Sequence, residues 1–192
     1  MAKKTSKQLE RDIQIALRRG VRHHAVKTLG PKQWFHGTST IVWDALKSGK
    51  TIPIQRAFRE SNVSLGGTYL TTKFPLAKVY AENAAREIGG DPVVLVVKEE
   101  FPLLPDEDLA AKLTDYRVPE TKDRRLRGLV DALFADPNYY DGVSMSDLYR
   151  DRYDELNDEY GITWKDSLKY THNVRQKQPL RAAQVVGDVQ LS

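Results

Sequence analysis

The sequence contains no cysteine among its 192 residues. Disulfide bonds, zinc sites built from cysteine and catalysis by a thiol nucleophile are therefore excluded. Histidine is scarce, with four in the chain, and two of them, His23 and His24, are adjacent. Adjacent side chains point apart in a helix or a strand, so this pair is poorly suited to hold a metal ion. We expect no metal site.

Long hydrophobic runs are also absent. No apolar segment approaches the ~18–20 residues that a membrane-spanning helix needs, and no apolar stretch follows the basic start at residues 1–4, as it would in a secretory signal. The apolar fraction of 40% and the charged fraction of 29% are ordinary for a soluble domain. Together with the lack of cysteine, these features predict a cytoplasmic protein that does not enter a membrane.

The net charge of +4 is distributed unevenly along the chain. Residues 1–32 hold nine lysines and arginines against two acids, whereas residues 99–160 hold eight against seventeen. A basic segment can bind nucleic acid or an acidic protein surface. A solvated helix face that contacts the protein's own acidic block would explain the same pattern.

Hydrophobic periodicity predicts that helices and strands are mixed in the first half of the chain. A capping-box pattern at Thr5 begins an amphipathic helix of about 14 residues that ends near Gly20, so residues 1–30 are expected to form a basic helical arm. The domain proper, 31–192, then shows strand patterns at 33–36, 68–72 and 93–97, helical patterns at 41–49 and 74–89, and a loop at 50–65.

The second half of the chain begins with a charged block, which we expect to be a helical insertion at about 108–160. Its last part, 147–160, has few apolar positions and predicts an exposed helix. Strands are expected near 170–175 and at 182–189. Because strands and helices do not alternate regularly, the pattern predicts an α+β fold with a largely antiparallel core.

The common catalytic motifs do not occur in the sequence: it has no phosphate-binding glycine loop, no serine nucleophile elbow and no metalloprotease histidine pair. Two short segments remain in which a strand pattern meets glycine, residues 34–38 (WFHGT) and residues 67–71 (GTYLT). Tyr80 follows in the next helical pattern. Each segment alone is typical of an ordinary strand end or turn, but their order and spacing together indicate a site.

In this order the two segments resemble the diphtheria-toxin and poly(ADP-ribose)-polymerase branch of the ADP-ribosyltransferases, which carries a His-Tyr-acid triad. Residues 35–38 and 178–186 are also similar to segments of the small rifamycin ADP-ribosyltransferases. The resemblance covers residues 33–98 well and the C-terminal strand loosely. It implies a split antiparallel β-sandwich with flanking helices, which binds NAD⁺ as a substrate in a cleft between two small sheets.

The resemblance also implies roles for individual residues. His36 would hydrogen-bond a ribose hydroxyl, and the backbone of Gly37, followed by Thr38 in the same NAD⁺-binding segment, would bond the nicotinamide amide. Tyr69 would stack on the nicotinamide ring, which is cationic before cleavage and favours an electron-rich aromatic face. Tyr80 would form a second aromatic wall.

The acid of the implied triad would stabilise the oxocarbenium-like transition state. The rifamycin-modifying relatives place it after the strand that follows the tyrosine helix, which favours Asp106, with Glu107 and Asp108 adjacent. The polymerase-like relatives place it at a late strand, where this chain has Gln184 instead. Three consecutive carboxylates are also typical of a helix N-terminus, where they complement the helix dipole.

The leading hypothesis is an NAD⁺-dependent ADP-ribosyltransferase that cleaves the nicotinamide–ribose bond and modifies an unknown protein, nucleic acid or small molecule. An RNA 2′-phosphotransferase or an NAD⁺-hydrolysing toxin would use the same implied fold, and Arg56 and Arg59 are the nearby candidates for a phosphate site. A module that binds NAD⁺ or ADP-ribose without catalysis is a hypothesis from a different class.

Overall fold

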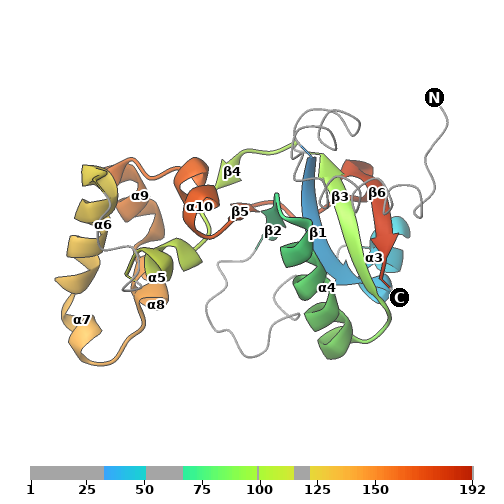
Figure 1. The fold of residues 1–192 in the computed structure, drawn as a ribbon, viewed down its shortest axis with the longest axis horizontal. Helices are drawn as coiled ribbons and strands as arrows, with labels where there is room; N and C mark the ends of the chain where they lie inside the picture. The colour runs from blue at the N-terminus through green and yellow to red at the C-terminus, as the bar shows by residue number, and fades with distance from the viewer. Residues whose placement is uncertain (1–32, 51–66, 99, 115–121, 192) are drawn as a thin grey trace.

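A computed structural model describes residues 33–50, 67–98, 100–114 and 122–191 (Figure 1). The expected basic arm at 1–30 and nearly all of the expected loop at 50–65 lie outside these residues. The described part is an α+β structure with one antiparallel sheet and several helices. This confirms the fold class and the antiparallel core that the sequence predicts.

Six strands form the sheet in the order β4-β5-β2-β1-β3-β6, and all neighbours are antiparallel. Residues 93–97 of β3 are buried without interruption, as their unbroken apolar run predicts for a strand covered on both faces. The strands are β1 (Gln33–Ser39), β2 (Thr68–Thr71), β3 (Pro92–Lys98), β4 (Leu103–Leu104), β5 (Asn173–Gln176) and β6 (Val185–Gln190).

The pairing between β1 and β2 is the least extensive in the sheet. These strands pair at a single position, Phe35 opposite Thr71, whereas β1 pairs with β3 along its whole length. The sheet therefore consists of two three-stranded halves, β4-β5-β2 and β1-β3-β6, that join at one point. After Phe35, the residues of β1 have no strand partner in the described ranges along the edge that faces β2.

Two helices cover opposite faces of the β1-β3-β6 half. Trp43 and Leu46 of α3 (Thr40–Lys47) pack in one apolar cluster with Leu95, and Ala77 of α4 (Phe74–Ile88) packs in another with Val94. Successive side chains of a strand point to opposite faces, so β3 contributes to both clusters. Both helices follow the expected ranges, and Pro75 lies in the first turn of α4, where a missing N–H costs nothing.

Helix α4 crosses β1 very closely at Gly37. A Cβ atom at this position would lie 2.0 Å from the carbonyl oxygen of Ala77 and 2.5 Å from the backbone nitrogen of Ala81. No side chain fits there, so the glycine has a packing role whatever else it does.

Five helices between residues 108 and 160 of the described chain gather at one end of the molecule, beyond β4 and β5 (Figure 1). They enclose a hydrophobic core of their own, which includes Leu109, Leu126, Leu129 and Leu133. None of the helices in the described ranges is long and apolar enough to cross a membrane. The five are α5 (Asp108–Thr114), α6 (Arg124–Phe134), α7 (Pro137–Tyr140), α8 (Met145–Asp151) and α9 (Tyr153–Tyr160).

The prediction of a single exposed helix at 147–160 is wrong. The segment forms the end of α8 and all of α9, which meet at Arg152, and Tyr149 and Leu156 are fully buried. Tyr153 and Leu156 lie three positions apart on α9, so they share one face of that helix. That face packs into the helical core while the charged residues remain outside.

The C-terminal elements differ from the expected boundaries. Residues 164–170 form α10 (Trp164–Tyr170). Strand β5 begins later than predicted, directly after His172, whose positive φ of 65° is incompatible with extended strand backbone. Strand β6 also begins late, because the 3₁₀ turn η2 (Ala182–Gln184) precedes it. The two-residue strand β4 was not predicted, since so short a strand has no periodicity to detect.

Candidate functional site

Tyr69, on β2, contacts a carboxylate from a distant turn. Its phenol hydroxyl donates a hydrogen bond to Oε1 of Glu107, which lies between β4 and α5. Glu107 is only 5% exposed, and Tyr69 is half-buried. The structure thus brings the predicted tyrosine together with an acid of the predicted cluster, but that acid is Glu107 and not Asp106.

His36, on β1, contacts the backbone of the same tyrosine. Its Nδ1 lies 2.9 Å from the carbonyl oxygen of Tyr69. A carbonyl oxygen can only accept, so Nδ1 carries the proton and donates it. Burial lowers the pKa of His36, with the Tyr69 carbonyl as a smaller opposing influence. The imidazole is therefore neutral at pH 7, and its Nε2 is a hydrogen-bond acceptor.

The third linkage connects Tyr80 to Asn173. Nδ2 of Asn173, at the start of β5, donates to the hydroxyl of Tyr80 on α4 at 2.7 Å. The side chain of Asn173 is also the smallest of the influences that lower the pKa of Asp106. Tyr69 is therefore bonded to Glu107, and Tyr80 to an asparagine that influences the neighbouring Asp106.

Asp106 is held by one hydrogen bond of its backbone and one of its side chain. Its N–H donates to Oγ of Ser167 on α10 at 2.9 Å, and its own Oδ1 accepts from the N–H of Asp108 at 3.1 Å. The side chain is 2% exposed. Burial, followed by the negative charges of Asp108 and Glu107, raises the pKa of Asp106 to about 7. At neutral pH this carboxyl group is therefore partly protonated.

The residues do not all lie on one face of the sheet. Tyr69 is directly opposite Arg175, and Thr71 is opposite Asn173, so these four side chains share a face. It is the face that α4 covers, because Tyr80 reaches Asn173 there. His36 alternates with Phe35, which packs on α4, so its ring belongs to the other face and hydrogen-bonds the Tyr69 backbone from there.

The remaining predicted residues have structural roles. Thr38 is buried and pairs with Val93 of β3. Gln184 is buried within the C-terminal turn, where its Oε1 accepts from the N–H of Arg181 at 2.9 Å and its Nε2 donates to Gln176 at 3.3 Å. Asp108 begins α5 and is exposed. The two candidate phosphate ligands, Arg56 and Arg59, lie outside the described residues.

Three residues of the site were not predicted: Ser167, Asn173 and Arg175. All three come from the C-terminal part of the chain, and each is buried. Nothing in the local sequence marks them, because a lone serine, asparagine or arginine acquires its role only from the strand pairing and helix packing that surround it. The irregular step at His172, directly before Asn173, has no sequence signal of its own either.

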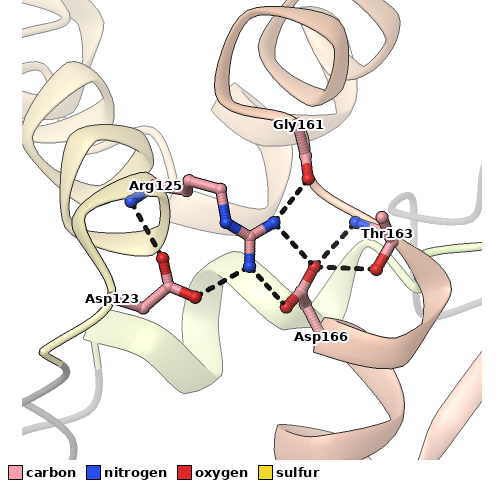
Figure 2. Close-up of polar contacts among 5 residues, drawn as sticks. All are labelled: Asp123, Arg125, Gly161, Thr163 and Asp166. Carbon is pink, nitrogen blue, oxygen red and sulfur yellow. Dashed lines mark hydrogen bonds and ion pairs between the residues drawn. The ribbon is translucent and has the colours of Figure 1, made fainter.

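Helix α10, which supplies Ser167, is attached to the helical end of the molecule by an arginine-centred network (Figure 2). Arg125 lies between Asp123 and Asp166, at 2.7 Å and 3.1 Å, and also donates to the carbonyl oxygen of Gly161 at 2.6 Å. Asp166 in turn completes the capping box of α10 with Thr163. The network therefore fixes the start of α10, whose Ser167 accepts a hydrogen bond from the backbone of Asp106.

No group of histidine and carboxylate residues in the described part of the chain is arranged to hold a metal ion. Comparison of the chain with protein-family models, with curated proteins and with solved structures finds no match.

Proposed function

We propose that this protein is an ADP-ribosyltransferase that uses NAD⁺ as its substrate. The single observation that carries the proposal is that the Tyr69 hydroxyl donates to Glu107 while the Tyr69 carbonyl accepts from the neutral His36. Histidine, tyrosine and acid follow one another in the order that the sequence resemblance implies. Three segments far apart in the chain therefore supply the three kinds of group that the chemistry needs.

The narrow joint of the sheet supports the same proposal. The implied fold is a split antiparallel sandwich, and here two three-stranded halves meet only at Phe35 and Thr71. We propose that NAD⁺ enters where β1 and β2 separate. Beyond Phe35 the backbone of β1 has no pairing partner on β2 within the described residues, so Gly37 could bond an amide of the ligand.

His36 would accept a hydrogen bond from a ribose hydroxyl. Its protonation supports this role, because Nδ1–H is committed to the Tyr69 carbonyl and the neutral ring leaves Nε2 as an acceptor. Because Nε2 carries no proton, it can accept a hydrogen bond from a ribose O–H but cannot donate one to the ligand. Tyr69 and Tyr80 would supply aromatic surface for the nicotinamide, which is cationic before cleavage.

The reaction requires a carboxylate that keeps its charge. The bond between ribose C1′ and the nicotinamide nitrogen breaks, nicotinamide leaves with the electron pair, and positive charge develops on the ribose. The acceptor then bonds to C1′ and loses a proton. A fixed carboxylate near the developing charge stabilises this transition state. Asp106 is partly protonated at pH 7, so Glu107, oriented by Tyr69, is the better candidate for this role.

The proposal is tested by incubating the full chain with NAD⁺ and cell lysate, and by measuring released nicotinamide and labelled ADP-ribose on products. We expect both, and about 100-fold less of each, or lower, when Glu107→Gln is used. Absence of both with the wild-type protein overturns the proposal. Loss of NAD⁺ without a labelled product would instead indicate a hydrolase, and NAD⁺ binding without turnover a binding module. A 2′-phosphorylated RNA substrate separates the phosphotransferase alternative.

A further inference from the structure

A pocket of about 310 Å³ lies next to the candidate site, between the β4-β5 edge of the sheet and the junction of α8 and α9. Leu104, Arg175 and Lys177 line it from the sheet side, and residues 150–155 line it from the helices. In Figure 1, β4 and β5 lie between the helical end of the molecule and β1. A volume of this size accommodates a small organic group rather than a whole dinucleotide.

The floor of the pocket is a fixed arginine. Arg175 is 5% exposed, and its guanidinium carbon lies 5.0 Å from the ring centroid of Tyr153. The hydroxyl of Tyr153 donates to the carbonyl oxygen of Pro105 at 2.6 Å. The guanidinium fork is thus held in place by an aromatic ring that is itself bonded to the turn carrying Glu107. A rigid planar fork of this kind is suited to recognise phosphate.

The charges around the pocket are not equally available to a ligand. Arg150 pairs with Asp147 at 2.9 Å, and Arg152 pairs with Glu155. Lys177, in contrast, is exposed and has no ion-pair partner within the described residues. The acids Asp151 and Asp154 also line the pocket. Asp151 pairs with Arg150 at 3.3 Å, so its charge is partly compensated.

The position of the pocket relative to the candidate site follows from the strand order. His36 lies on β1, Tyr69 on β2 and Arg175 on β5, so Arg175 is on the opposite side of Tyr69 from His36. Tyr69 and Arg175 are directly paired, and Arg175 is also paired with Leu104. A ligand in the pocket would therefore lie on the side of Tyr69 that faces away from the proposed NAD⁺ entry.

We propose that this pocket is the acceptor subsite and that it binds an acceptor carrying a phosphate group. Arg175 and Lys177 would bind the phosphate, while Leu104 and the edge of Tyr153 would contact its organic part. This inference rests on the proposed function, because it assigns the second substrate of the same site. The phosphate binding itself is measurable without NAD⁺.

The first experiment measures binding of phenyl phosphate to the full chain by calorimetry in the absence of NAD⁺, with phenol as the ligand lacking phosphate. We expect a Kd below about 1 mM for phenyl phosphate and no binding of phenol. Lys177→Gln should weaken binding about fivefold, and Arg175→Lys, checked for folding by circular dichroism, should weaken it further despite the retained charge. Lys165→Gln, an exposed lysine outside the pocket, is the matched control.

Equal binding of phenyl phosphate to wild-type protein, Lys177→Gln and Lys165→Gln would overturn the proposal, as would no binding at all. The second experiment measures nicotinamide release as NAD⁺ is varied. Phenyl phosphate should leave the KM for NAD⁺ unchanged. Competition with NAD⁺ would show that the pocket holds the NAD⁺ diphosphate, which contradicts an acceptor role. If no nicotinamide is released under any condition, the proposed function fails while the binding result stands.

Discussion

The hydroxyl of Tyr69 donates its hydrogen bond to Glu107, while the N–H of Asp106, one residue earlier, donates to Oγ of Ser167. Two consecutive carboxyl groups therefore have different surroundings. Glu107 is oriented by a phenol, and Asp106 is buried among other negative charges, which raises its pKa to about 7. Adjacent acids with separated environments are suited to different chemical roles.

Exchanging each acid for its amide should separate these roles. Glu107→Gln removes the charge that would stabilise the oxocarbenium-like transition state, and we expect kcat for nicotinamide release to fall about 100-fold or more. Asp106→Asn removes a group that is already partly neutral, so its effect on kcat at pH 7 should be about tenfold or less. Steady-state kinetics at saturating NAD⁺ measures both. The reverse order of effects would identify Asp106 as the acid.

The stability of the protein should depend on pH through Asp106. Its pKa in the folded state, about 7, lies above the ordinary value of 3.8, so the folded protein binds more protons than the unfolded chain between these values. The free energy of unfolding should therefore fall as pH rises from about 4 to 7, by up to roughly 1.4 kcal/mol per pH unit from this group, and level off above.

The contribution of Asp106 is isolated by urea unfolding of the wild-type protein and of Asp106→Asn at pH 4.5, 6 and 7.5. The difference in unfolding free energy between the two proteins should move in favour of the variant as pH rises. A difference that is constant across this range would mean that the carboxyl group titrates at its ordinary pKa.

Gly37→Ala should destabilise the protein strongly. The added methyl group would lie 2.0 Å from the carbonyl oxygen of Ala77 and 2.5 Å from the nitrogen of Ala81, and both of these atoms belong to the packed backbone of α4. We expect a loss of about 3 kcal/mol, measured by urea unfolding. Gly49→Ala is the matched control, since Gly49 has a positive φ of 77° but nothing within 4 Å of an added Cβ, and should lose only about 1 kcal/mol.

Ser167→Ala should also reduce stability, because its hydroxyl links two buried backbone groups. Its Oγ accepts from the N–H of Asp106 and donates to the carbonyl oxygen of Asn173, each at 2.9 Å. Removing it leaves both groups without that partner, at a cost of about 2–3 kcal/mol in unfolding free energy. Ser48→Ala, which loses an exposed bond to the Ala45 carbonyl, should change stability by less than about 0.5 kcal/mol.

The local elements could be predicted from the sequence wherever one pattern dominates. The unbroken apolar run at 93–97 predicts the central strand, and Pro75 and Gly89 correctly bound helix α4. The predictions fail where tertiary contacts set the boundary. The few apolar residues at 147–160, Tyr149 and Leu156 among them, predict an exposed helix, but they are buried because α5 and α6 supply the rest of the core.

The candidate site divides in the same way. His36, Tyr69 and the acidic cluster at 106–108 could be selected from the sequence, because each lies in a short motif beside a strand or a helix start. The choice between Asp106 and Glu107 could not, since consecutive residues differ only in the direction of their side chains. That direction depends on Ser167 and Tyr69, which come from distant parts of the chain.

The sequence by itself determined the α+β class, the main strands and helices, and the residues among which a site should be sought, because periodicity and glycine or proline positions act locally. Only the tertiary structure decided that the sheet joins at a single pair, that Glu107 rather than Asp106 meets Tyr69, and that Arg175 borders a pocket beside them. These relationships arise from antiparallel pairing between segments about 100 residues apart, such as β2 with β5, and such pairing leaves no periodic trace in either segment alone.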